Sequence, residues 1–482
     1  MLLSVALTSL LAFPLSLAQE AVLGVYVFHR HGDRTSKSTP PANLTDLGYQ
    51  GIYASGAYYR SRYITSEGAL KINGISKDFV RLSQISVSAP ADTVLQNSAQ
   101  GFLQGLYPPV GEALASQTLR NGTNVTSPLN GYQLIPVGLV STGGGSEDNS
   151  WLQSASGCKA AISSSNNFFY SDDYTNLLSN TRNFYSALLP VVSATFNSGY
   201  MSFKNAYTIY DLVHVAEIHN ATIPSSDLLT TSTLHQMQTL ADAHEWGLAY
   251  NASDNMRAIS GMTLAAQIVQ FLNNTIATQG RASKIGIQFG AYASFASFFG
   301  LTDLPSINSD FFGIVDYASA MTFELFTNNS DVSAAYEKPE ELYVRFLFHN
   351  GTTSDASPPV RYPLFGQPRM ELSWSEFTAG MNKFAIGTTR EWCSACGNST
   401  GTCAEYANPA GSSSATNTSS TQTQSGNRLS PAVSGVLGAM VTLAVVLGVQ
   451  ALIMILGGLK VVKKNKLSRR GTAAEMDSTI KA

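Results

Sequence analysis

The chain is 482 residues long, with 44% hydrophobic residues, 13% charged residues and a formal net charge of −3. This length corresponds to one large or two medium domains, and the hydrophobic content is that of a globular protein. The small net charge excludes the strongly basic field expected of a nucleic-acid-binding protein, and the sequence has no acidic tail.

The first 18 residues form a predicted signal peptide. Residues 2–17 are apolar except for small hydroxyl residues, and Pro14 interrupts them. Ser16 and Ala18 supply the small residues that precede a cleavage site, so cleavage is expected after Ala18. The basic residues that usually begin such a peptide are missing. A buried core helix is the alternative for this segment.

The predicted globular domain covers residues 19–405. It begins with a nearly continuous apolar run at 21–28, which predicts a strand buried on both faces. A helix is expected to begin near residues 44–48, with Thr45 or Asp46 as its cap.

Later segments of the same domain continue this alternation. Residues 262–272 have helical spacing, and residues 285–289 predict a second buried strand. Together these elements predict an α/β fold with a mostly parallel central sheet and helices on both faces. The more polar middle, roughly 105–260, is expected to form a smaller helical cap.

The C-terminal part predicts a membrane anchor. Residues 406–430 are rich in Ser, Thr, Gly and Asn and predict a stalk, O-glycosylated, that cannot form a packed core. Residues 431–459 carry no charge and exceed the roughly 20 residues that cross a bilayer. The basic segment at 460–482 is expected to stay in the cytoplasm, which puts the N-terminal domain outside. A cleaved lipid-anchor signal would end in its apolar tail.

Sequons and cysteines agree with export. The ten Asn-x-Ser/Thr asparagines all lie on the predicted outer side: Asn43, Asn121, Asn124, Asn220, Asn251, Asn273, Asn328, Asn350, Asn398 and Asn417. An even number of cysteines in an exported protein predicts two disulfides among Cys158, Cys393, Cys396 and Cys403. Their pairing stays open. Zinc or redox chemistry at Cys393 and Cys396 is the weaker alternative, and no metal site or cofactor is predicted.

The segment His29 to Thr35 carries the clearest chemistry. It directly follows the first predicted strand, and the carboxyl ends of strands are where ligands bind in open α/β sheets. Arg30 and Arg34 bracket His31, and guanidinium groups bind phosphate oxygens in pairs. An imidazole between them can attack phosphorus, and the nearby positive charge disfavours its protonated form. The alternative is a merely polar strand end.

With this loop, the chain resembles the histidine acid phosphatase family, in the larger branch of the histidine phosphatase superfamily, and looks fungal in type. The resemblance covers most of residues 21–405, through segments at 30–35, 44–50, 59–63, 98–109, 209–211, 218–220, 321–325 and 344–346. It implies the phosphoglycerate mutase-like fold, His31 as the nucleophile, and Arg30 and Arg34 as phosphate ligands.

Two parts of the family pattern are missing. The family has a third arginine just before the 98–109 segment, but this sequence has no arginine between Arg81 and Arg120. The family also has a His-Asp pair after a late strand, where we align Tyr292 and Ala293. Tyr292 can still donate a hydrogen bond to phosphate, whereas alanine cannot protonate a leaving group. Asp33 is a weaker candidate for that proton.

The other histidines are interpreted as structural or surface groups, namely His29, His214, His235, His244 and His349. Asp254 and Arg257 are expected to lie in a loop and to face solvent. Two functions follow. The first is an extracellular acid phosphatase acting on small phosphomonoesters, with weakened activity. The second is an inactive surface paralogue that binds phosphate-bearing ligands. The cell surface is the expected location, with the vacuolar membrane as the alternative. A mutase or phytase has no positive support in the sequence, and the oligomeric state is open.

Overall fold

The structure, a computed structural model, describes residues 20–65, 70–140, 157–220 and 222–407. The predicted signal peptide, membrane helix and basic tail lie outside these ranges, as do Asn417 and most of the predicted stalk. Within the described part of the chain, no helix is both long enough and apolar enough to span a bilayer.

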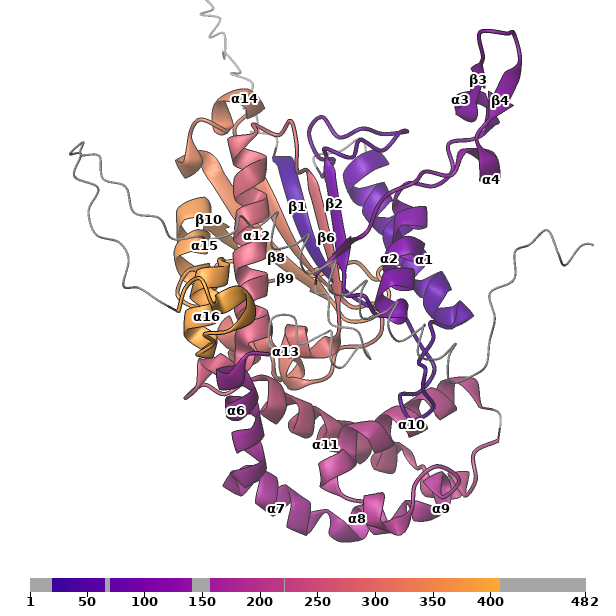
Figure 1. Cartoon of the computed structure of the whole chain (residues 1–482), viewed down its shortest axis with the longest axis vertical. Coiled ribbons are helices and arrows are strands. Elements are labelled where there is room, and N and C mark those ends of the chain that lie inside the picture. The colour runs from indigo at the N-terminus through magenta and orange to yellow at the C-terminus, as the bar shows by residue number, and fades with distance from the viewer. Residues whose placement is uncertain (1–19, 66–69, 141–156, 221, 408–482) are drawn as a thin grey trace, which may run out of the picture. The chain divides into compact units, whose positions relative to one another are not determined.

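A mixed eight-stranded sheet lies at the centre (Figure 1). Its strands are β1 (Ala21–Arg30), β2 (Ile85–Ala89), β5 (Gly138–Leu139), β6 (Ile285–Gly290), β7 (Ala320–Thr327), β8 (Leu342–His349), β9 (Val360–Tyr362) and β10 (Glu371–Ser373). They follow the order β10-β8-β7-β1-β6-β2-β5, with β9 paired to β8. The pairs among β1, β6, β2 and β5 are parallel, whereas β7 to β10 pair antiparallel. The predicted α/β class is confirmed, with an antiparallel half that the sequence did not indicate.

Strand β1 is apolar from Ala21 to Phe28, and it has a hydrophobic core on each face. Val25 and Val27 pack against α1 (Asp46–Arg60) and α2 (Thr93–Leu106). Leu23 and Phe28 pack on the other side, against α12 (Ile259–Ala277), α13 (Tyr292–Leu301) and α15 (Trp374–Met381). Helices therefore cover both faces of the sheet, as predicted (Figure 1).

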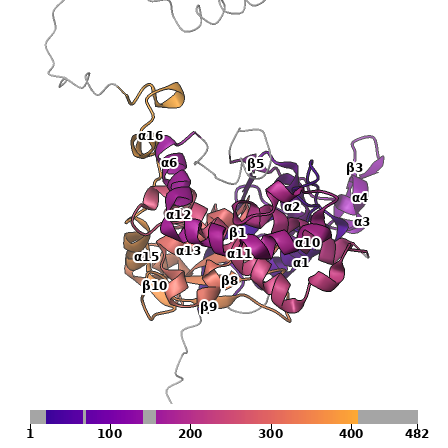
Figure 2. The same ribbon diagram turned by 90° about the horizontal axis from the view of Figure 1, so that it is seen from below.

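The helical cap lies across one end of the sheet (Figures 1 and 2). It contains α6 (Lys159–Asn167), α7 (Asp172–Asn180), α8 (Arg182–Ala187), α9 (Leu189–Val192), α10 (Ala206–His219) and α11 (Thr231–Ala249). A separate core that includes Tyr185, Phe203 and Ile209 joins α7 to α11, whereas Ala161 of α6 packs in another cluster with residues of α12. The cap begins later than expected. Part of the segment before it forms a small hairpin of β3 (Ser116–Thr118) and β4 (Asn124–Thr126), flanked by α3 (Glu112–Ala115) and α4 (Pro128–Gly131).

Two disulfides fix the C-terminal part of the domain. Cys158 pairs with Cys396, and Cys393 pairs with Cys403. The first bond joins the start of α6 to the end of α16 (Thr389–Cys396), and the second closes a short loop beyond α16. The prediction of two disulfides is confirmed, and with all four cysteines bonded, no thiol remains for zinc.

The prediction that Arg257 faces solvent was wrong. Only 7% of this residue is exposed, and its guanidinium donates to the carbonyls of Gly247 and Ser164, both at 2.5 Å. These carbonyls belong to α11 and α6, so Arg257 joins two cap helices that the sequence does not show to be neighbours.

Candidate active site

The loop after β1 lies where three chain segments meet at one end of the sheet. Arg30 pairs with Gly290 at the end of β6, and α13 begins two residues later at Tyr292. On the other side, the backbone N–H of Arg30 donates to the carbonyl of Ser319, just before β7. The sequence motif therefore stands at the carboxyl end of the central strand, as predicted.

The ring of His31 is oriented by its own backbone. Its Nδ1 atom lies 2.8 Å from the carbonyl oxygen of Gly32. A carbonyl oxygen can only accept, so Nδ1 carries the proton and the lone pair of the neutral ring is on Nε2. This is the tautomer that a nucleophilic histidine needs if it attacks through Nε2.

Two glycines let α1 approach this loop closely. A Cβ atom on Gly32 would lie 2.6 Å from the carbonyl oxygen of Gly48, and one on Gly48 would lie 2.1 Å from the carbonyl oxygen of Asp33. The hydroxyl of Thr45 accepts from the N–H of Gly48 at 3.0 Å and so caps α1, as predicted. The loop is thus held against the N-terminus of the helix.

Arg30 is almost fully buried, with 4% exposed. Its Nη1 donates to the carbonyl of Val315, while its Nε is buried without a hydrogen-bond partner among the described residues. The guanidinium carbon lies 4.5 Å from the ring centroid of Tyr317 and 5.4 Å from that of Tyr292. Such contacts stabilise the cation and still leave N–H donors for an anion.

Arg34 is held by the cap. Its Nη1 donates to Asp211 of α10 at 2.8 Å, and its Nη2 donates to the hydroxyl of Tyr207 at 3.1 Å. The carboxylate of Asp211 also accepts from the hydroxyl of Ser36 and the backbone N–H of Lys37, both at 2.9 Å. Helix α10 therefore fixes the second arginine.

One aromatic ring covers all three groups of the motif. The ring centroid of Tyr317 lies 5.6 Å from that of His31, and the guanidinium carbon of Arg34 lies 5.7 Å from it. With Arg34 and His31 both 0% exposed, phosphate can reach them only if covering side chains move.

The two positions that depart from the family pattern carry other contacts. The hydroxyl of Tyr292 donates to Glu245 at 2.7 Å, and Ala293 is buried beside it in α13. Burial alone would raise the pKa of Glu245, but the hydrogen bond and charge of His244 hold it below its usual value. Thr93 and Val94, which lie just before the 98–109 segment in the stretch without arginine, form the first turn of α2 behind the cap residue Asp92.

Lys37 is a cation of the site that the sequence reasoning missed. Its Nζ lies 4.7 Å from the ring centroid of Tyr207 and 5.4 Å from that of Tyr292. The only sequence signal for this role was the position of Lys37, three residues after Arg34. Tyr317 was also missed, because no local pattern connects it to a loop almost 290 residues earlier in the chain.

The other histidines differ in their surroundings. His29 is packed between Phe102 and Phe289, and burial lowers its pKa to about 4. His244 is buried 2.8 Å from Glu245. His214 stacks on Tyr210 and lies 6.0 Å from Tyr317, and burial and Arg30 both lower its pKa. None of these three is placed by the structure between Arg30 and Arg34.

The comparisons with known proteins agree with this architecture. The sequence matches the family described as histidine phosphatase superfamily (branch 2) over residues 39–349. That range begins after the loop, so the match and the loop are separate observations. A comparison with curated proteins gives no match.

Solved structures show the same fold. A Hafnia alvei phytase in complex with myo-inositol hexakis sulphate has 13% sequence identity and a TM-score of 0.50, covering 79% of this chain and 99% of that chain. A Citrobacter braakii phytase has 13% identity and a TM-score of 0.51, covering 78% and 99%. At such identities the likeness concerns the fold alone. By the extent of its sequence match, the chain belongs to branch 2 of the histidine phosphatase superfamily.

Proposed function

We propose that the chain is a phosphomonoesterase of the secretory pathway that uses His31 as its nucleophile. The observation that supports this most directly is the imidazole of His31, held through Nδ1 by the Gly32 carbonyl and flanked by two buried guanidinium groups. Arg30 and Arg34 would bind the phosphoryl oxygens, and Tyr292 would act as a further donor if it leaves Glu245.

The reaction would proceed in two steps. Nε2 of His31 attacks phosphorus, and the bond from phosphorus to the ester oxygen breaks, which gives a phosphohistidine and an alcohol. Water then attacks the phosphohistidine, which releases inorganic phosphate and restores the neutral imidazole. With alanine at position 293, the departing oxygen takes its proton from water, and the water that attacks in the second step gives one proton back to the solvent, so the two steps together consume one water molecule.

Activity should be weaker than in a member with the complete family pattern. A general acid contributes about 10²–10⁴-fold, and a transition-state hydrogen-bond donor contributes about 10²–10³-fold. Such losses are not additive. An aryl phosphate has a good leaving group and depends less on protonation, so the remaining activity should favour aryl over alkyl esters.

A secretory location is supported by the two disulfides, since disulfides persist in oxidising compartments. Seven sequon asparagines are exposed, namely Asn43, Asn121, Asn124, Asn220, Asn273, Asn328 and Asn350, whereas Asn251 and Asn398 are half-buried. The membrane anchor at residues 431–459, with the domain outside the cell, is part of this proposal and rests on the sequence alone.

The test is an assay of residues 19–405, produced in a secretory host, with p-nitrophenyl phosphate between acidic and neutral pH. We expect turnover that His31→Ala abolishes and Arg30→Ala reduces by at least about tenfold. Arg361→Ala is the control, because Arg361 is an exposed arginine of β9 that contacts Glu371, and β8 and β7 lie between β9 and β1. Folded protein with no activity above that of His31→Ala would overturn the enzyme proposal.

A non-catalytic, phosphate-binding surface protein is the second candidate. The burial of the loop under Tyr317 and the alanine at position 293 favour it. Calorimetric titration with inorganic phosphate separates the two, since Arg30-dependent binding without turnover would support this second function.

A further inference from the structure

Three tyrosines lie against the guanidinium groups of the loop after β1, namely Tyr207, Tyr292 and Tyr317. The hydroxyl of Tyr207 accepts from Arg34, and the hydroxyl of Tyr292 donates to Glu245. The hydroxyl of Tyr317 forms no hydrogen bond with any residue that the structure describes. Tyr317 is also half-buried, whereas the other two side chains are buried. Of these three covering groups, Tyr317 is therefore the one that can move at the lowest cost.

The ring of Tyr317 lies close to all three groups of the motif. Its centroid is 4.5 Å from the guanidinium carbon of Arg30, 5.7 Å from that of Arg34 and 5.6 Å from the ring centroid of His31. A phosphoryl group bound by both arginines has to lie within reach of the same three groups, about 3–3.5 Å from the attacking nitrogen. Because His31 and Arg34 are 0% exposed, that space is closed in this structure. The ring and a phosphoryl group therefore compete for one position.

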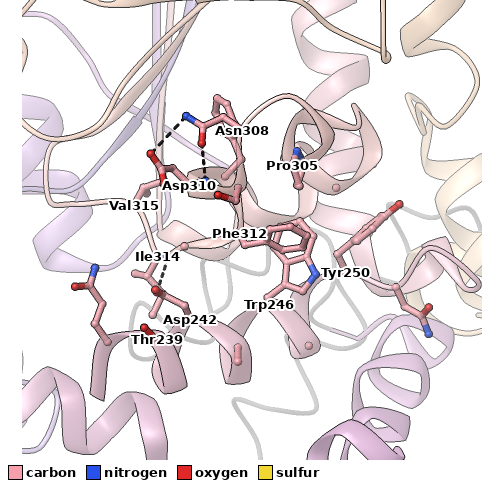
Figure 3. A pocket seen from close by; sticks show the side chains of 18 of the residues that line it. Thr239, Asp242, Trp246, Tyr250, Pro305, Asn308, Asp310, Phe312, Ile314 and Val315 are labelled. Atoms are coloured by element: carbon pink, nitrogen blue, oxygen red, sulfur yellow. Dashed lines mark hydrogen bonds between the residues drawn. The ribbon is translucent and has the colours of Figure 1, made fainter. Parts of the chain in front are cut away.

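The backbone on both sides of Tyr317 is held by hydrogen bonds. The N–H of Ala318 donates to the carbonyl of His31 at 2.9 Å. On the other side, the N–H of Ile314 donates to Asp242 of α11 at 2.8 Å (Figure 3). Uncovering the motif therefore requires a rotation of the Tyr317 side chain rather than a movement of the surrounding chain.

The residue after Tyr317 is strained. Ala318 has a φ of 65°, in the left-handed region that residues with a Cβ atom seldom adopt. Strain of this kind persists only where the surrounding structure requires it, and it is concentrated at functional sites. Here the strained residue bonds to the carbonyl of His31, so the position of the Tyr317 ring over the motif is maintained at a cost in backbone energy.

We propose that the Tyr317 side chain is a gate, which fills the phosphate position when closed and rotates away to admit a phosphomonoester. The inference rests on the proposed function, because it takes the phosphate to lie at Arg30 and Arg34. An open state that is only partly populated weakens the apparent affinity by its fraction. Tyr317 therefore raises Kd for phosphate and KM for esters, whereas the chemical step at His31 is unchanged once the ring has moved.

The accessibility of His31 tests the gate without any substrate. Diethyl pyrocarbonate acylates the neutral imidazole of accessible histidines, and mass spectrometry of peptides locates the product. For the full chain in detergent, we expect Tyr317→Ala to raise the modification rate of His31 by about tenfold or more. His235, an exposed histidine of α11, is the internal reference for the reagent. An unchanged rate at His31 in the folded variant would overturn the gate.

Further variants separate coverage by the ring from other roles. Tyr317→Phe keeps the ring and should leave the rate at His31 within about twofold of wild type, because the lost hydroxyl has no partner among the described residues. Tyr317→Leu replaces Tyr317→Ala if the latter does not fold, and it should raise the rate at least about threefold. Tyr343→Ala is the matched control and should leave the rate unchanged. Tyr343 is half-buried against Phe326, which pairs with Val22 at the other end of β1.

Phosphate measurements connect the gate to the reaction. In Tyr317→Ala, we expect Kd for inorganic phosphate and KM for p-nitrophenyl phosphate to fall by about tenfold, with kcat changed less than about threefold. His31-dependent turnover with equal KM values and equal modification rates in the two proteins would overturn the gate and leave the phosphatase standing. A raised modification rate without phosphate binding or turnover in either protein would support Tyr317 as the cover of His31, and the proposed function would fail.

Discussion

The Nε2 atom of His219, the last residue of α10, lies 2.6 Å from Oδ2 of Asp33 in the loop after β1. The same carboxylate oxygen accepts a hydrogen bond from the hydroxyl of Thr45, which caps α1. Asp33 is 5% exposed. One buried carboxylate therefore ties the loop both to the sheet domain and to the cap.

Asp33→Asn should destabilise the fold, because the amide loses the negative charge beside His219 and puts an NH2 group where the buried Oδ1 atom has no hydrogen-bond partner among the described residues. We expect the free energy of unfolding to fall by about 1–3 kcal/mol, as for a buried hydrogen bond to a charged group. Urea denaturation measures this loss, with the exposed Asp227→Asn as the matched control.

The same variant tests whether Asp33 protonates the leaving group. We expect Asp33 to position the loop, so kcat should change by a similar factor for aryl and alkyl phosphates. A loss confined to alkyl phosphates would instead make Asp33 the proton donor, since only poor leaving groups require one.

The elements that could be predicted from sequence are those set by local pattern. Strand β1 was predictable because both of its faces are buried, and α1 because Thr45 is a strong capping residue. The direction of β7 was not predictable, because every residue of this strand is buried and its pattern is that of a parallel strand.

Some residues near the candidate site could not be predicted, because their contacts are with residues far away in the sequence. His31, Arg30 and Arg34 could be proposed from the sequence because they form one short motif. Tyr317 covers that motif only because β7 pairs with β1, a register that the sequence does not show. Arg257 appeared to be a loop cation, and its partners became visible only when α6 and α11 were placed together.

The pair of Arg34 and Asp211 predicts a large effect on stability. Both side chains are buried, with 0% and 2% of their surface exposed. Asp211→Ala removes the carboxylate from a buried guanidinium, and breaking a buried pair in this way costs about 3–5 kcal/mol. Asp211→Asn should cost less, because the amide oxygen can still accept from Arg34. Guanidinium chloride denaturation compares the two. Equal losses would contradict this expectation and would mean that the amide oxygen does not replace the carboxylate as a partner of Arg34.

Glu324 predicts a loss of stability at low pH. Burial alone would raise the pKa of this carboxyl, but Arg62 and Arg345 outweigh burial and hold it below its usual value of 4.5. Because the pKa is lower in the folded state, the stabilisation is complete above about pH 4.5 and is lost as the pH falls through the folded-state value. Glu324→Gln should remove this part of the pH dependence.

The measurement for Glu324 is urea denaturation at several pH values. Wild-type protein should lose more stability than Glu324→Gln between pH 6 and pH 3, although the variant is less stable near neutral pH. Parallel curves for the two proteins would contradict the assigned role of Arg62 and Arg345.

The raised pKa of Asp242 predicts a pH dependence of stability opposite to that of Glu324. Burial raises its pKa to about 6, offset in part by the N–H of Ile314 and by His235, while Asp316 raises it further. Because the pKa is higher in the folded state, stability is greatest below the unfolded-state pKa, near 3.8, and is lost as the pH rises through about 6. At neutral pH the charged carboxylate therefore destabilises the fold, by at most about 3 kcal/mol.

Asp242→Asn should stabilise the protein at pH 7.5 by about 1–3 kcal/mol and change it little at pH 4, because the amide oxygen still accepts from Ile314. Thermal unfolding at both pH values checks this, with Asp227→Asn expected to have no effect at either. If Asp242→Asn were destabilising at pH 7.5, Asp242 would instead serve the packing of the 313–316 segment.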